Sequence, residues 1–67
     1  MISFLEGDVA ERSGGRVVIS VGGVGYVVQV PASTLAKLPP VGRPTGIYTR
    51  LVVRDDAMTL FGFANAD

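Results

Sequence analysis

Residues 30–40 read VPASTLAKLPP, and this stretch decides the fold. Leu35 and Leu38 have the i, i+3 spacing of one helix face, so residues 32–38 predict a helix of two turns at most. Proline stands on both sides of this window, and a proline within a helix would remove a backbone donor and clash with the preceding turn. The stretch therefore predicts one short helix, followed by a loop over residues 39–44.

The rest of the chain is rich in β-branched residues, with eleven Val, three Ile and four Thr. Such residues pack well on a pleated sheet but lose rotamer freedom in a helix, so strands should surround the helix. Gly22 and Gly23 predict a tight hairpin, and Gly7 and Gly25 are candidate positions for a bend or bulge. Three strands are predicted before the helix and two after it: Ile2–Arg12, Arg16–Val21, Val24–Val30, Ile47–Arg54 and Ala57–Phe63.

The order β-β-β-α-β-β indicates an all-β fold with one short helix, and specifically the OB-fold, a five-stranded Greek-key barrel. An SH3-like barrel is the alternative, because it has a similar number of strands, but its short helical turn more often comes late in the chain. We expect a single OB-fold domain over residues 1–63 and a tail over residues 64–67, since 67 residues leave no room for a second domain.

The composition argues against an enzyme. The chain has no Cys and no His, so it lacks disulfides, thiolates, the commonest zinc ligand and the commonest general base. None of the nine glycines precedes a Lys-Ser or Lys-Thr pair, which excludes a Walker A ATP site. We therefore expect no catalytic residue, no metal and no cofactor.

Charge and hydropathy give expectations about location. Six basic and six acidic residues give a formal net charge of zero, so charge alone does not indicate nucleic-acid binding. The N-terminal segment lacks the features of a signal peptide, and no apolar run approaches about 18 residues. We expect a cytoplasmic protein with no membrane contact.

The densest charge cluster is Arg54-Asp55-Asp56, between the last two predicted strands. Asp is a common turn residue because its carboxylate bonds to nearby backbone N–H groups, and this interpretation alone accounts for the pair. The functional alternative is a negatively charged hairpin tip. Several strands also carry apolar residues on both faces, which indicates either coverage by barrel closure and the helix or a subunit interface.

The chain resembles the N-terminal domain of the bacterial Holliday junction branch migration subunit RuvA. The resemblance covers essentially the whole chain. It rests on Met1-Ile2 with Leu5-Glu6-Gly7, on the block from Val21 to Tyr26, on Val30-Pro31 with Leu38-Pro39, and above all on Tyr48 to Ala57 followed by Leu60-Phe61-Gly62-Phe63.

This resemblance implies a non-catalytic DNA-binding subunit of an ATP-dependent branch migration complex, acting in recombination, DNA repair and the SOS response. It implies a homotetramer that holds four-way junction DNA and works with a hexameric AAA+ ATPase motor. Asp55 and Asp56 match the family's acidic pin at the junction centre, where Glu often stands in place of Asp55, and Arg54 is a candidate phosphate contact.

The same resemblance implies that most phosphate contacts come from a helix-hairpin-helix domain absent here, so that residues 64–67 would begin the linker to it. Two other functions stay open. One is a generic OB-fold module for single-stranded nucleic acid, which would need exposed aromatic side chains and a basic groove. The other is a purely structural oligomerisation domain.

Overall fold

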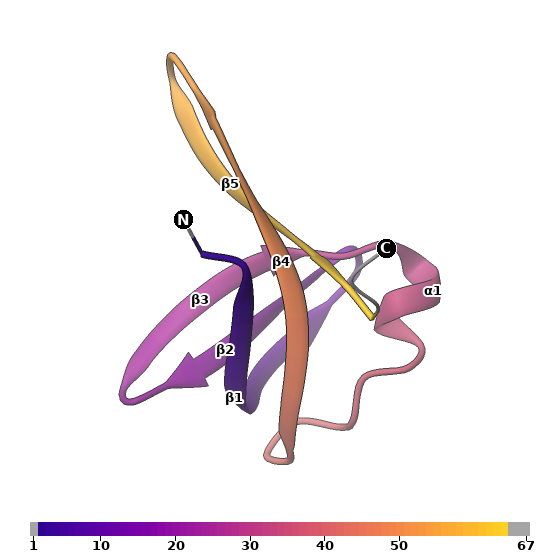
Figure 1. Cartoon of the computed structure of the whole chain (residues 1–67). Coiled ribbons are helices and arrows are strands. Elements are labelled where there is room, and N and C mark those ends of the chain that lie inside the picture. Colours follow the sequence, from indigo (N-terminus) through magenta and orange to yellow (C-terminus); the bar gives the residue numbers. More distant parts are fainter. Residues whose placement is uncertain (1, 65–67) are drawn as a thin grey trace.

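Five strands and one helix follow each other in the predicted order in the computed structural model, which describes residues 2–64 (Figure 1). The helix α1 lies between the third and fourth strands, as the sequence predicts. The elements are β1 (Phe4–Ser13), β2 (Arg16–Val21), β3 (Val24–Gln29), α1 (Ala32–Leu35), β4 (Pro44–Arg54) and β5 (Ala57–Phe63).

The strands close into a barrel in the order β1-β2-β3-β5-β4, with β4 pairing back to β1. All neighbouring pairs are antiparallel except β3 and β5, which run parallel over a short stretch. The crossover from β3 through α1 to β4 leaves β5 beside β3. This topology, with its helix between β3 and β4, confirms the OB-fold prediction over the SH3-like alternative.

Strand β1 belongs to two parts of the barrel, because its first half pairs with β4 and its second half with β2. Gly7 lies where these halves meet, and a Cβ atom there would overlap the backbone carbonyl oxygen of Ser20. The prediction that this strand serves two parts of the barrel is confirmed, but its register irregularity lies between Val9 and Glu11 rather than at Gly7. The predicted bulge at Gly25 is wrong, because β2 and β3 pair in continuous register past it.

The predicted β2 and β5 match the observed bounds, whereas other ends differ. The helix ends at Leu35, since the amides of Lys37 and Leu38 bond to carbonyls three residues back, as in a 3₁₀ turn. Strand β1 starts two residues later than predicted, and β3 ends one residue earlier. Strand β4 begins at Pro44 rather than Ile47, because the first residue of a strand tolerates a missing N–H.

The barrel interior is filled by medium-sized aliphatic side chains from every strand. The Gly22-Gly23 turn has the predicted positive φ angles and lets β2 and β3 pair along their full length. Leu35 and Leu38 pack against this interior, as their spacing predicts. The buried apolar residues are Leu5, Val9, Val17, Ile19, Val28, Val30, Ile47 and Leu60.

Residues 65–67 of the predicted tail, and Met1 of the opening motif, lie outside the described residues. The domain boundary at residue 63 therefore stays a prediction. Among residues 2–64, no helix has the length and hydropathy needed to cross a membrane.

Candidate nucleic-acid interface

The β4–β5 hairpin projects well beyond the barrel and ends in a tip of two residues (Figure 1). Its strands pair without interruption from Tyr48 opposite Phe63 to Arg54 opposite Ala57. Both strands are long enough to leave the barrel because their β-branched and apolar residues continue past the core. The hairpin is therefore the element that presents the predicted site residues.

Asp55 and Asp56 form the two-residue turn at this tip, and both are exposed. Neither has a positive φ angle, so the turn is not the type I′ that usually closes such a short hairpin. The structure thus brings the predicted acidic pair and Arg54 together at the most projecting point of the chain. Adjacent like charges fixed by a turn repel any further negative charge that approaches them.

One face of the hairpin continues the interior of the barrel. Near its base this face carries Thr49 opposite the buried Gly62, and Leu51 opposite Leu60. A Cβ on Gly62 would lie 2.6 Å from side-chain atoms of Ile47 and Val28, so any larger residue there requires these side chains to move.

Farther out the same face is apolar but uncovered: Val53 is 64% exposed and its cross-strand neighbour Met58 is 70% exposed. The hairpin's inner face therefore leaves the core and becomes an exposed apolar surface near the tip.

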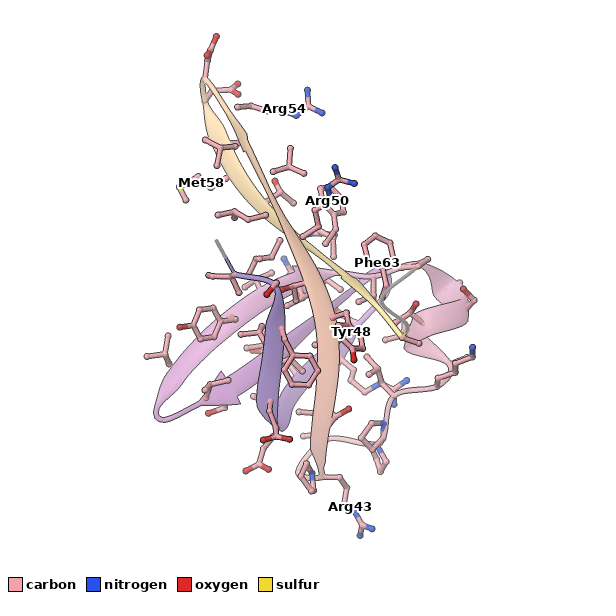
Figure 2. The ribbon with its side chains drawn as sticks, viewed as in Figure 1. Arg43, Tyr48, Arg50, Arg54, Met58 and Phe63 are labelled. Carbon is pink, nitrogen blue, oxygen red and sulfur yellow. The ribbon has the colours of Figure 1, made fainter. Side chains whose placement is uncertain are left out.

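The other side of the hairpin, which we call the outward face, carries basic and aromatic side chains. Tyr48 lies opposite Phe63, Arg50 lies opposite Phe61, and Arg54 follows toward the tip. In Figure 2 the side chains of Arg50, Arg54 and Phe63 lie on one side of the hairpin, and Met58 lies on the other. The hairpin therefore has an apolar face, a basic and aromatic face, and an acidic tip.

Sequence reasoning named Arg54, Asp55 and Asp56 but assigned no role to Arg50. The sequence did contain a signal for Arg50, since the period-two alternation of a strand puts Arg50 on the same face as Arg54. What the alternation does not reveal is which face stays outside once the barrel closes. Within residues 2–64, no three His, Cys, Asp or Glu side chains come together as metal ligands would.

Comparisons with known proteins give one consistent result. The family model described as the RuvA N-terminal domain matches residues 1–62. The chain is 50% identical over 64 residues to a Pseudomonas aeruginosa PAO1 protein named Holliday junction branch migration complex subunit RuvA, covering 96% of this chain and 32% of that protein.

Proteins with the same name from Stutzerimonas stutzeri and Rubrobacter xylanophilus are 48% and 49% identical, over 96% and 100% of this chain. The matches cover 32% and 34% of those two proteins. The chain thus spans about a third of the length of these relatives.

Proposed function

This chain belongs to the family of RuvA N-terminal domains, and from that premise we propose that it is the part of a DNA-binding subunit that recognises four-way Holliday junctions and supports branch migration. The observation that carries the proposal is the acidic turn of Asp55 and Asp56 at the end of a projecting hairpin. This turn is suited to act as a pin at the centre of a junction.

The pin would work by repulsion. In a homotetramer, four copies around one axis would bring eight carboxylates to the point where the exchanging strands cross and their phosphates crowd. Repulsion at that point disfavours stacked arms and favours separated strands. Asp55 and Asp56 would therefore set the geometry of the junction rather than add affinity for it.

Arg54 is the attractive counterpart of the pin in this proposal. It is exposed, directly precedes the turn and pairs with the small Ala57 across the hairpin. A guanidinium at that position can bind a phosphate with two parallel hydrogen bonds while the neighbouring carboxylates repel the opposite strand. The three residues would thus hold one strand and turn another away.

We place the motor contact and most phosphate contacts in the two thirds of the relatives' length that this chain does not match. In this proposal the chain is a non-catalytic subunit, and a hexameric AAA+ ATPase drives the DNA. The zero net charge of this domain agrees with such a division, because affinity from counterion release requires an excess of basic residues.

One observation favours the alternative of a module for single-stranded nucleic acid. Four of the five aromatic side chains, those of Phe4, Tyr48, Phe61 and Phe63, are exposed rather than packed in the barrel. Exposed aromatic side chains beside arginines can stack on unpaired bases. The two functions differ in the preferred DNA, since a junction binder discriminates against both duplex and single strands.

The test replaces the pin by its neutral isosteres, with Asp55→Asn and Asp56→Asn together. It uses a full-length RuvA that carries this domain in place of its own N-terminal domain, and compares affinity for a four-way junction, a duplex and a single strand. Asn retains the turn-forming capacity of Asp, so the hairpin should persist. Junction affinity should stay level or rise, while selectivity for the junction over duplex should fall.

The control is Arg43→Gln, which changes an exposed charge on the opposite side of the molecule (Figure 2). The measurement is repeated at two salt concentrations, because repulsion is screened over about 8–10 Å. Unchanged selectivity at low salt would make Asp55 and Asp56 ordinary turn residues. Weaker junction binding would instead assign them an attractive role, such as bridging a cation to phosphate.

A further inference from the structure

The outward face of the β4–β5 hairpin combines cations and aromatic rings in a regular pattern. Arg50 and Arg54 are four residues apart on one strand, or about 13 Å at 3.3 Å per residue. Phe61 lies directly across from Arg50, and Phe63 lies across from Tyr48. The basic side chains therefore lie along the hairpin from its tip toward the barrel, and the aromatic side chains lie at the base of the hairpin, next to the barrel.

The rings at the base are held in place but not covered. Tyr48, Phe61 and Phe63 are 43%, 38% and 39% exposed. The ring of Phe4 meets that of Tyr48 edge to face, with centroids 5.1 Å apart. Because aliphatic side chains fill the barrel interior, these larger rings remain on its surface. They form an exposed aromatic platform, on which flat apolar ligands can stack.

An open groove of about 330 Å³ adjoins this platform between β3 and β5. Its volume is at the lower end of the range of small-ligand sites, about 300–1,000 Å³. The groove is lined by Gly15, Gln29, Val30, Pro31, Phe61 and Phe63.

Among the described residues, the outward face carries no acidic side chain. The acidic residues of the described chain outside the tip, Glu6, Asp8 and Glu11, are all on β1. The charged side chains of the outward face are Arg50 and Arg54 alone among the described residues of β4 and β5. A molecule that is zero in net charge therefore presents a positive strip directly behind a negative tip.

We propose that the outward face of the hairpin binds an unpaired DNA strand, with Arg54 and Arg50 on its phosphates and Phe61 stacked on a base. This inference rests on the proposed function, since the strand that Arg54 would hold beside the acidic tip is the one that would continue along this face. It differs from the usual OB-fold site over the second and third strands. The outward residues of β2 and β3 include one charged side chain, that of Arg16, and no aromatic ring.

The first experiment maps the contact on the 67-residue chain by NMR, with a single-stranded oligothymidylate of about ten nucleotides as the probe. Amide shifts should change along β4 and β5, from Tyr48 to Arg54 and from Ala57 to Phe63. The changes should shrink as salt rises, because phosphate contacts release counterions. Shifts centred on β2 and β3, or none at millimolar DNA, would overturn the proposal.

The second experiment compares variants that retain the fold, as checked by circular dichroism. Phe61→Leu should weaken oligothymidylate binding about tenfold, because one stacked base is lost, while Phe61→Trp should preserve it. Arg50→Gln should reduce the salt slope of the binding constant by about 0.7. Arg43→Gln, an exposed arginine away from the hairpin, is the matched control and should have little effect.

A protein partner on this face would give a different result. Phe61→Leu and Arg50→Gln would then leave oligothymidylate binding unchanged. They would instead lower the mass that sedimentation measures for the complex of the full-length RuvA carrying this domain. That result would overturn the proposal. Failure of the proposed function is distinguishable. If the full-length RuvA with the unsubstituted domain showed no preference for the junction over duplex but the 67-residue chain bound oligothymidylate, junction recognition alone would be refuted. A junction preference without oligothymidylate binding would refute this inference alone.

Discussion

Arg12 should contribute more to the stability of this domain than any other exposed side chain. From β1 its Nη1 donates to the carbonyl oxygens of Leu38 and Pro39, each at 3.0 Å, and its Nη2 donates to that of Leu35 at 2.9 Å. Carbonyl groups at the end of a helix have no intrahelical partner. Of the three acceptors, Leu35 ends α1 and its carbonyl also accepts from the amide of Leu38, while Leu38 and Pro39 lie beyond the helix. One guanidinium therefore ties the end of α1 and the following loop to the barrel.

The perturbation is Arg12→Met, which keeps most of the aliphatic stem and removes the donors. A hydrogen bond from a charged group contributes about 1.5–3 kcal/mol. Two of the three bonds share one nitrogen, and all three are exposed, so water recovers much of the loss. We expect a decrease of about 2 kcal/mol in the free energy of unfolding, out of about 3–10 kcal/mol for a chain of this size.

The assay is urea unfolding followed by circular dichroism, with Arg43→Met as the matched control. A decrease of this size lowers the melting temperature by about 8–16 °C in so small a domain. Arg12→Lys should fall between the wild type and Arg12→Met, because one ammonium cannot reach all three carbonyls in the fork geometry. A difference of less than about 0.5 kcal/mol between Arg12→Met and the control would refute the reasoning.

Two glycine substitutions give the remaining predictions, with Gly14→Ala as their common control because its new Cβ would meet nothing within 4 Å. Gly7→Ala should cost at least about 3 kcal/mol, since the methyl group would overlap the carbonyl oxygen of Ser20 and the backbone would have to move. Gly62→Ala should cost about 1–3 kcal/mol, because side chains such as Val28 can shift partly to admit the methyl group. Urea unfolding measures both, and equal stabilities for all three variants would contradict the packing argument.

Local sequence patterns were sufficient to predict the ends of a strand where turn residues bound it. The bounds of β2 and β5 follow from alternating apolar residues between glycines or aspartates, and both match the structure. The predicted strand ends are wrong where contacts between distant segments of the chain determine them. Pro44 joins β4 because Asp8 of β1 lies opposite it, and a proline-rich segment offers no local signal for that partner.

The bulge in β1 was misplaced for a related reason. Glycine marks positions where a bend is possible, so Gly7 and Gly25 were the candidates. The register shift instead occurs between Val9 and Glu11, where β1 pairs with β2 beyond its crossing to β4. At Gly7 the need for glycine comes from Ser20, thirteen positions away, and no local pattern contains that contact.

The sequence by itself determined the class of the fold, the position of its helix and the contiguous set Arg54, Asp55 and Asp56, because alternation, turn residues and neighbouring charges are local properties. Only the tertiary structure decided that the hairpin extends beyond the barrel and that its two faces differ. Closing five strands around a small aliphatic core turns one face of β4 and β5 inward and leaves Arg50 and Phe61 on the other. That division depends on which strands become neighbours, a property of the closed barrel rather than of any segment.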